Sequence, residues 1–311
     1  MRAIRVPPAT APVRLDVFLA QHVPHCSRRT AQRAIAGGEV RINDRRARKG
    51  QLVRDNDLIQ VAEELFAPPA LQPNAQLALR VLYEDAAVIA VDKLAGMPSQ
   101  ALRAHEMDTV ANFLLAKYPE LAAVGKSTQE AGLVHRLDVN TSGVLLAART
   151  ADAYRFLRQE FARHRVGKEY LALVEGHIAA PGVVRTAIAH DRRNRRKMRV
   201  APSSGRVSRP RQAVTHFRPL ERFRDTTLVA VEIPTGVMHQ IRVHLASAGH
   251  PIIGDRLYGS PVRRAPRQLL HAAKLSLTHP DTRQPLEVCC PLPADFAEFL
   301  NGLRETEPAA G

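Results

Sequence analysis

A proline-rich stretch without any repeat of apolar residues divides the sequence into a short and a long part. Residues 63–79, EELFAPPALQPNAQLAL, carry three prolines and fit neither the helical nor the strand pattern. Proline removes a backbone donor and disfavours both a helix interior and a central strand. We therefore expect a small domain over residues 1–62, a linker over residues 63–79 and a larger domain over residues 80–311.

Basic residues gather in two regions of the chain. The net charge is +15 and the isoelectric point is near 10.6. Residues 1–62 hold 12 Lys and Arg against 5 Asp and Glu, and residues 181–225 hold 13 against 3. An arginine-rich composition alone would explain the high isoelectric point but not this clustering. The two regions indicate a polyanionic partner, above all a nucleic acid.

The short part predicts two helices followed by a small hairpin. Residues 14–23, RLDVFLAQHV, repeat apolar side chains at helical spacing. In the next segment Ser27 is suited to begin a helix and Gly37 to end it. Arg29 and Arg33 are four residues apart and so share one face of that helix. The segments EVRIND and DLIQVAEE predict short strands around an Asn-Asp turn.

This pattern resembles a known RNA-binding module. The segment SRRTAQRAIAGGEVRINDRRARKGQLVRDNDLIQV follows the S4-type module, named for a ribosomal protein, through its whole length. The resemblance implies that RNA is the partner of the small domain. Because few acidic residues lie close to its basic helix in the sequence, we expect Arg28, Arg29 and Arg33 to contact phosphates.

Helices and strands alternate irregularly beyond residue 80. The expected strands are RVLYEDAAVIAVDK (two runs about a turn), KEYLALVEG and TTLVAVEIP, and the expected helices are TVANFLLAKYPE, ADAYRFLRQEFARH and HQIRVHLASAG. In the last helix Ile241, Leu245 and Ala248 share one face, and Gly249 is the expected stop. Because there is no regular βαβ rhythm, we expect an α+β domain around a mixed, mostly antiparallel sheet.

Several kinds of site and location are disfavoured. His239 and His244 are five residues apart, not the four that places two ligands on one helical face, and no cysteine pair has zinc spacing. There is no Walker-type glycine loop and no Gly-x-Ser-x-Gly segment, so we expect neither a metal nor another cofactor. Short apolar runs, the lack of a secretory-type leader and three cysteines without a disulfide pattern favour a cytoplasmic protein that does not enter a membrane. We expect a monomer.

The segment HRLDVNTSG, residues 135–143, admits two interpretations. Asp, Asn, Ser and Gly are the residues that a turn leading into a strand needs. The same turn could instead aim the carboxylate of Asp138 into a cleft. Taken alone, the residues leave both interpretations open.

The wider sequence context resembles an enzyme family. HRLDVNTSG matches the active-site motif of RluA-type pseudouridine synthases, His-Arg-Leu-Asp-x-x-Thr-Ser-Gly, without departure. Further segments follow in the order of the family: VLYEDAAVIAVDKLAGMPS, GKEYLALVEG, HQIRVHLASAGHPIIGDRLYG and HAAKLSL. Over residues 80–295 the chain is thus similar to enzymes that isomerise uridine in RNA without a cofactor.

The resemblance implies roles for four residues. Asp138 is the expected catalytic carboxylate, acting as nucleophile or as charge stabiliser, and Arg242 is its expected ion-pair partner. Tyr170 is expected to stack on the target base and to assist proton removal. Arg136 is expected to enter the space that the flipped nucleotide vacates, since a base must leave the RNA stack to react.

Other positions are expected to be structural or depart from the family pattern. We expect structural roles for His135, Asp255 and Tyr258. Val237 and Met238 stand where the family usually has Arg and Thr, and Leu94 and Gln100 replace the usual proline and a frequent histidine. These departures bear on which uridine is chosen more than on the reaction.

The leading hypothesis is an RNA pseudouridine synthase. An S4-type module is typical of family members that modify large-subunit ribosomal RNA, so we expect this substrate, with transfer RNA as the alternative. A non-catalytic RNA-binding factor of ribosome assembly is a second hypothesis, although a pure binder has no use for a carboxylate that faces phosphates. A glycoside hydrolase normally needs two carboxylates at the bond it cuts, and this motif supplies one.

Overall fold

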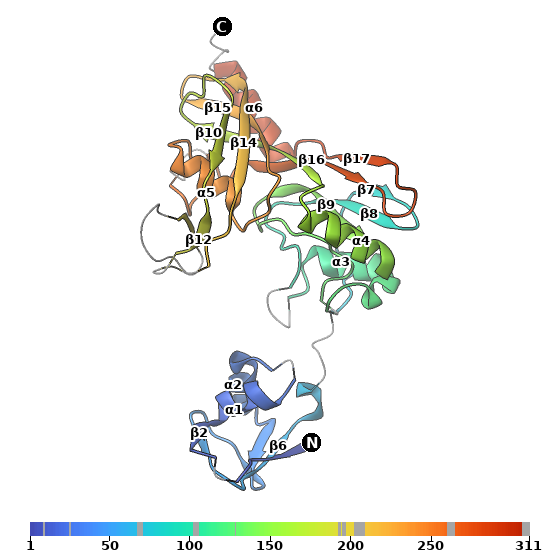
Figure 1. The fold of residues 1–311 in the computed structure, drawn as a ribbon, viewed down its shortest axis with the longest axis vertical. Coiled ribbons are helices and arrows are strands. Elements are labelled where there is room, and N and C mark those ends of the chain that lie inside the picture. The colour runs from blue at the N-terminus through green and yellow to red at the C-terminus, as the bar shows by residue number, and fades with distance from the viewer. Residues whose placement is uncertain are drawn as a thin grey trace. The chain divides into compact units, whose positions relative to one another are not determined.

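The computed structural model describes residues 1–8, 10–24, 26–66, 71–101, 106–127, 129–191, 194, 197–201, 209–259 and 265–306. The chain divides into two compact units, Met1–Ala70 and Leu71–Gly311 (Figure 1). The division falls within the stretch expected to be a linker, and the described ends of that stretch pack into the two units: Leu65 is buried in the smaller core and Leu71 in the larger. None of the helices in the described ranges has the length and hydropathy that a bilayer span requires.

The smaller unit packs two helices on a four-stranded sheet. The helices are α1 (Leu15–His22) and α2 (Arg28–Gly37). The sheet has the order β1–β6–β3–β4, made of β1 (Arg2–Arg5), β6 (Leu58–Val61), β3 (Val40–Ile42) and β4 (Arg45–Arg46). A second pair joins β2 (Val13–Arg14) to β5 (Leu52–Val53), and the 3-10 helix η1 (Glu63–Leu65) follows β6. Phe18, Leu19 and Ile59 are among the side chains of its core.

Local sequence signals explain the ends of α2 and the hairpin. The Ser27 hydroxyl accepts the backbone N–H of Thr30 at 3.1 Å, as an N-cap does. Gly37 is still helical, and the helix ends one residue later than predicted because Gly38 adopts the left-handed conformation. Asn43 and Asp44 both have positive φ, which suits the tight turn between β3 and β4.

The described part of the larger unit is built on a nine-stranded sheet. Its order is β11–β14–β15–β10–β16–β9–β8–β7, with β17 beside the second half of β16. Neighbouring strands are antiparallel except β9 and β16, which are parallel, so the predicted mixed and mostly antiparallel α+β fold is confirmed. The strands are β7 (Val81–Glu84), β8 (Val88–Lys93), β9 (Ser142–Ala148), β10 (Gly167–Glu175), β11 (Gly182–Arg185), β14 (Val214–Arg222), β15 (Thr226–Glu232), β16 (Leu270–Thr278) and β17 (Pro285–Cys289).

Helices and a short hairpin cover this sheet (Figure 1). They are α3 (Val110–Lys117), η2 (Pro119–Ala123), α4 (Ala151–Ala162), α5 (Gln240–Ser247), α6 (Ala294–Thr306), and the hairpin of β12 (Ile188–His190) with β13 (Met198–Val200). The predicted cap Thr109 begins α3. The prediction of one apolar face for α5 was too narrow: residues 240–245 are all buried, whereas Ala248 lies beyond the helix and is exposed.

The strand register brings together residues far apart in sequence. In β16, Ala272 pairs with Gly143 of β9 on one side and with Tyr170 of β10 on the other. Gly143 has φ +116°, and a Cβ atom there would lie 2.2 Å from the carbonyl oxygen of Ala272. The register of β10 against β16 shifts between Glu169 and Tyr170, as it does at a β-bulge. The start of β9, with the turn before it, and Tyr170 of β10 therefore lie on opposite sides of β16, separated by that one strand.

Gly143→Ala should destabilise the larger unit, because alanine would have to adopt an unfavourable φ and would overlap the carbonyl oxygen of Ala272. We expect the free energy of unfolding in urea to fall by at least about 2 kcal/mol. Gly302→Ala is the control, since Gly302 lies in α6 with nothing within 4 Å of an added Cβ, and alanine there should be neutral or stabilising. Equal stabilities of the two variants would contradict this account of Gly143.

Candidate active site

Asp138 occupies the turn that leads into β9. The backbone N–H of Thr141 donates to the carbonyl oxygen of Asp138 at 3.0 Å and closes the turn. The Asp138 side chain is 24% exposed, and its Oδ2 accepts a hydrogen bond from Nη1 of Arg242 at 2.9 Å. The carboxylate is therefore fixed on one side and open to a ligand on the other.

A second carboxylate holds Arg242 in place. Nε and Nη2 of Arg242 donate to the two oxygens of Asp255 at 2.7 and 2.8 Å, a bidentate pair. Asp255 is fully buried and the Arg242 side chain is 8% exposed. Burial lowers the pKa of Arg242, but the hydrogen bonds and charges of Asp255 and Asp138 outweigh it and hold that pKa above its ordinary value. Arg242 is thus a permanent cation shared by two carboxylates.

Asp255 and Tyr258, which the sequence suggested were structural, both contact the ion-pair network. Oδ1 of Asp255 also accepts the backbone N–H groups of Leu257 and Tyr258. The ring of Tyr258 lies 5.1 Å from the Arg242 guanidinium carbon. Sequence reasoning missed this link, although an aspartate soon after the HQIR segment offered a possible partner for its arginine.

Two hydrogen bonds link Met198, Tyr258 and His239, and His239 lies close to Asp138. The backbone N–H of Met198 donates to the Tyr258 hydroxyl at 2.8 Å, which leaves the hydroxyl proton free to donate to Nδ1 of His239, also at 2.8 Å. Nε2 of His239 then carries its own proton and lies 3.7 Å from Oδ2 of Asp138. Burial lowers the pKa of His239, with the charge of Asp138 acting against it, so the ring is neutral near pH 7.

Tyr170 lies close enough to Asp138 for the charge of that carboxylate to affect the pKa of the tyrosine hydroxyl. Its side chain is buried in the core of the larger unit. Burial, together with the charge of Asp138, raises the pKa of Tyr170 well above that of a free phenol. The hydroxyl is therefore neutral at physiological pH, which suits a stacking ring or a hydrogen-bond donor better than a phenolate base.

Lys93 binds the same turn through the backbone carbonyl group of Val139. Its side chain is fully buried, and Nζ donates to the carbonyl oxygens of Leu94, Met97 and Val139 at 2.7–2.9 Å. Burial lowers the pKa of Lys93 to about 7, while the charge of Asp138 acts in the opposite direction. Sequence reasoning did not single out this residue, although a lysine at the end of an apolar strand is a recognisable signal of a buried, partnered charge.

The two residues that open the HRLD segment differ in role. Nε2 of His135 accepts the backbone N–H of Leu146 at 3.0 Å, and its ring stacks on Phe161. Burial lowers the pKa of His135 to about 3, so it is a neutral hydrogen-bonding histidine, as predicted. Arg136 has an exposed side chain, and its charge acts on neighbouring His239.

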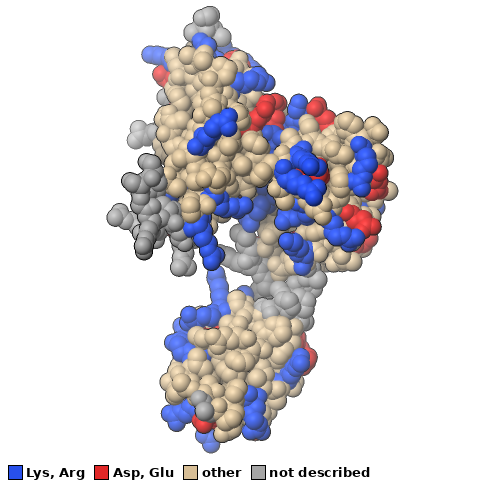
Figure 2. All heavy atoms as spheres, in the orientation of Figure 1, with Lys and Arg blue, Asp and Glu red and all other residues tan. Residues whose placement is uncertain are grey.

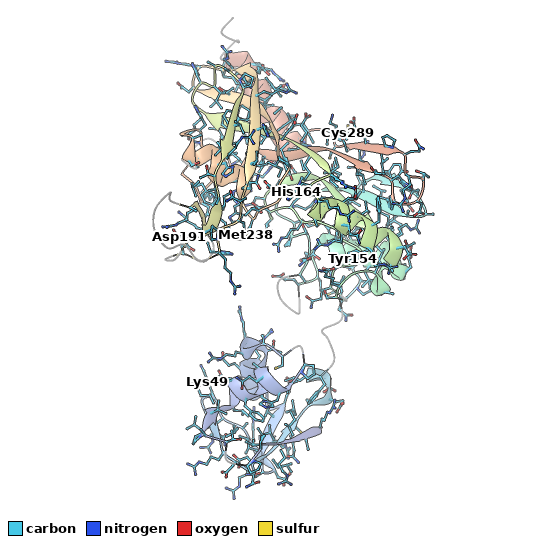
Figure 3. The ribbon with its side chains drawn as sticks, in the orientation of Figure 1. Lys49, Tyr154, His164, Asp191, Met238 and Cys289 are labelled. Atoms are coloured by element: carbon cyan, nitrogen blue, oxygen red, sulfur yellow. The ribbon has the colours of Figure 1, made fainter. Side chains whose placement is uncertain are left out.

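Two of the four departures from the family pattern, the adjacent Val237 and Met238, have different surroundings. Val237 is buried in a small apolar cluster with Ile188, Met198, Ala213 and Val243. Met238 is 37% exposed, and in the view of Figure 3 it and Asp191 are drawn in the same part of the larger unit. Val237 thus helps to seat the β12–β13 hairpin beside the start of α5.

The arginines expected to bind phosphate are not equivalent. Arg28 donates to Asp16 at 3.2 Å, so the expectation that it lacks an acidic neighbour was wrong. Asp16 is 3% exposed, and its hydrogen bond from Arg14 contributes most to lowering its pKa. Arg29 and Arg33 are exposed, and no carboxylate in the described ranges pairs with either.

Basic side chains are prominent on the surface of both units (Figure 2). On the face of the smaller unit that is drawn there, Lys and Arg are far more prominent than Asp and Glu. Of the second basic region, residues 192–193, 195–196 and 202–208 lie outside the described residues.

A cavity of about 510 Å³ lies elsewhere on the sheet. It is lined by residues of β10, β14, β15 and β16 and by the segment before β10, among them His164, Lys168, Glu169, Glu232 and Lys274. Its lining includes none of the three residues expected to carry the chemistry. Among the described residues no group of three or more His, Cys, Asp or Glu side chains has the arrangement of a metal site.

The hydrogen-bond chain predicts the tautomer of His239. In protein labelled with nitrogen-15 at histidine, we expect the ring nitrogens of His239 to report the neutral form protonated at Nε2, because Nδ1 accepts from Tyr258. Tyr258→Phe should convert this signal to a mixture of tautomers, whereas Tyr83→Phe, whose hydroxyl bonds to Asp85, should leave it unchanged. The signals that disappear in His239→Gln are those of the His239 ring nitrogens, which assigns them. Protonation at Nδ1 in the unsubstituted protein would refute the proposed direction of the chain.

Family models match most of the described sequence. Residues 87–247 match the family described as RNA pseudouridylate synthase, and residues 13–59 match the S4 domain. Both family resemblances inferred from the sequence are thereby confirmed.

Individual relatives are similar in sequence over nearly the whole chain, and a solved structure is similar over most of it. A protein of Xylella fastidiosa named ribosomal large subunit pseudouridine synthase D is 36% identical, over 98% of this chain and 93% of the other. An uncharacterized RNA pseudouridine synthase of Chloroflexus aurantiacus is 40% identical, over 98% and 94%. The solved structure of human RNA pseudouridylate synthase domain containing 4 is similar with a TM-score of 0.59 and 26% identity, over 72% of this chain and 92% of that one.

Proposed function

The chain belongs to the RNA pseudouridylate synthase family and is an RNA uridine isomerase, and from that premise we propose that Asp138 is its catalytic carboxylate and large-subunit ribosomal RNA its substrate. The observation that carries the proposal is the 2.9 Å ion pair between Asp138 and Arg242. A carboxylate that is partly open, held by a permanent cation and next to a buried aromatic ring has the means to stabilise positive charge on a ribose and to receive a base.

The reaction needs only positioned side chains. The bond from ribose carbon 1′ to uracil nitrogen 1 breaks, the uracil turns, and a bond from carbon 1′ to carbon 5 forms. The proton on carbon 5 leaves, and nitrogen 1 gains a proton. Asp138 either stabilises the charge that develops on carbon 1′ or attacks carbon 1′ as nitrogen 1 leaves, and in the second case the bond to Asp138 breaks when carbon 5 bonds to carbon 1′. Since nothing is oxidised or reduced, the proposal invokes no redox cofactor.

Three neighbours assist Asp138 in this proposal. Arg242 keeps the carboxylate ionised and oriented while its own charge stays fixed by Asp255. Tyr170 provides a neutral ring on which the extruded uracil stacks. Arg136, exposed in the same segment as Asp138, fills the gap left in the RNA helix.

The smaller unit supports ribosomal RNA as the substrate. It carries the S4 domain match and presents Arg29 and Arg33 as exposed cations on α2. Four of the relatives that match over nearly their whole length are named for the ribosomal large subunit. A transfer RNA substrate is the alternative within the same chemistry. The proposed catalytic groups all come from one chain, so we propose a monomer. We also propose that it acts in the cytoplasm, in keeping with relatives named for the ribosomal large subunit.

Asp138→Asn should abolish isomerisation, since it removes the charge while keeping the shape of the side chain. We expect the single-turnover rate on a large-subunit ribosomal RNA fragment to fall below about 1% of wild type, a loss of more than about 2.7 kcal/mol of transition-state stabilisation. RNA affinity should stay within about twofold, because few phosphate contacts depend on this carboxylate. Asp152→Asn, at an exposed position on α4, is the control and should retain full activity. Substantial turnover by Asp138→Asn would assign the chemistry to another group.

The double variant Arg29→Gln with Arg33→Gln should weaken RNA binding and flatten its salt dependence. Each lost phosphate contact should lower the slope of log affinity against log salt by roughly 0.7–0.9. Deletion of residues 1–70, the whole smaller unit, should weaken RNA binding and its salt dependence further. The truncated protein should still turn over its substrate at saturating RNA. Arg54→Gln, on the turn before β6, is the control.

The same assays separate the two substrates. Faster turnover of the ribosomal RNA fragment than of transfer RNA is expected. The opposite preference would overturn the proposed substrate, and an unchanged salt slope would remove α2 from the RNA interface.

A further inference from the structure

Arg267 connects the C-terminal helix to the turn that carries Asp138. Nε and Nη2 of Arg267 donate to the two oxygens of Asp295, in the first turn of α6, at 2.5 and 2.7 Å. Its remaining terminal nitrogen, Nη1, donates to the carbonyl oxygen of Asn140 at 3.2 Å and to that of Gln268 at 3.0 Å. One guanidinium therefore joins α6 to a residue two positions after Asp138.

The turn is held at consecutive carbonyl groups. The Ser99 hydroxyl donates to the carbonyl oxygen of Leu137, and Lys93 donates to that of Val139. The turn's own N–H at Thr141 satisfies the carbonyl of Asp138, which leaves that of Asn140 to Arg267. Arg267 thus supports the side of the turn that leads into β9, together with Gln268, whose side-chain amide donates to the hydroxyl of Thr141. The Arg267 side chain is only 8% exposed.

The segment around Arg267 also fixes the second carboxylate of the site. Gly254 precedes Asp255 and has φ +78°, and a Cβ atom there would lie 1.9 Å from the carbonyl oxygen of Arg267. The N–H of Leu269 donates to the carbonyl of Ile253 at 2.9 Å. Residues 267–269 therefore contact both the Asp138 turn and the Asp255 loop. In this way they help to set the distance between the two carboxylates that Arg242 binds.

The helix that carries Asp295 is firmly attached to the sheet. Phe296 and Leu300 are buried against Leu173, Leu228 and Leu269. The hydrogen bonds from Arg267, together with their opposite charges, lower the pKa of Asp295, so that carboxylate is ionised at neutral pH. The packed helix thus holds the Asp295 carboxylate in place for Arg267, and Arg267 binds the carbonyl group of Asn140.

We propose that Asp295 and Arg267 are positioning residues that hold the catalytic turn against α6, so that turnover depends on the seating of the C-terminal helix. The proposal rests on the proposed catalytic role of Asp138. Neither residue touches the substrate in this account. Their contribution is to keep the carboxylate at the distance from ribose and base that the reaction requires, where displacements of about 1 Å can cost 100-fold in rate.

Asp295→Asn tests the proposal, and the chain supplies a matched control. Glu221→Gln breaks a comparable bidentate pair, in which Arg304 of α6 bonds to Glu221 of β14, away from the turn. For Asp295→Asn we expect the single-turnover rate at saturating RNA to fall between about tenfold and 100-fold with unchanged RNA affinity. Hydrogen exchange at the amides of residues 140–142 should become faster. Glu221→Gln should lower the melting temperature at most slightly, because Arg304 is 48% exposed, and it should leave the rate and this exchange unchanged.

Two further variants complete the design. Arg267→Lys keeps the charge but cannot form the bidentate pair and reach Asn140 at once, so it should resemble Asp295→Asn in rate. Asp138→Asn in the same assay separates the two proposals. An inactive Asp138→Asn beside a fully active Asp295→Asn would overturn the positioning role alone. Equal rate losses in Asp295→Asn and Glu221→Gln would also overturn it, because α6 would then act only through stability. An active Asp138→Asn would overturn both proposals.

Discussion

Arg242 lies between two carboxylates, and the arrangement of the site depends on that pair of contacts. Asp255 takes two of its nitrogens inside the protein, and Asp138 takes the third at the edge of solvent. A buried arginine needs such partners, since removing one carboxylate of a buried pair leaves an uncompensated charge that costs about 3–5 kcal/mol. The inner pair satisfies the charge on the guanidinium, so that Asp138 can remain partly open to RNA. His239 lies on the same side of Asp138, with Nε2 3.7 Å from the carboxylate and Nδ1 hydrogen-bonded to the hydroxyl of Tyr258.

The fold delivers these groups through strand register rather than through local sequence. Parallel pairing of β9 with β16 places the Asp138 turn at one side of Ala272, and antiparallel pairing of β10 with β16 places Tyr170 at the other. Glycine at 143 is required because its neighbour's carbonyl occupies the space of a side chain. Buried basic side chains then hold the turn from inside the protein: Lys93 binds the carbonyl of Val139, and Arg267 binds that of Asn140. The carboxylate of Asp138 is therefore partly exposed, whereas nearly everything that positions it is buried.

Much of this could be predicted from the sequence, and the limits have physical reasons. Periodicity and capping residues located α2, α3 and the strands β3, β6, β7, β8, β10 and β15, because these signals are local. The motif around Asp138 and the arginine of HQIR pointed to the ion pair through family resemblance. Asp255, Lys93 and Arg267 were not assigned to the site, because their partners are backbone carbonyls or distant side chains that no spacing encodes. Arg28 was placed among free cations for the same reason: Asp16, twelve residues earlier, approaches it only after α1 and α2 have packed. Ala248 fits a helical stripe in the sequence but lies past the point where α5 ends.

A structure of Asp138→Asn bound to an RNA substrate would test the central claim most directly. The account predicts that the target uridine is out of the helix with its ring on Tyr170, its ribose against the side chain at position 138, and Arg136 in the gap. Arg242 should keep its bidentate contact with Asp255 in that complex. A uridine bound in the cavity over Glu169 and Glu232, away from position 138, would contradict the account.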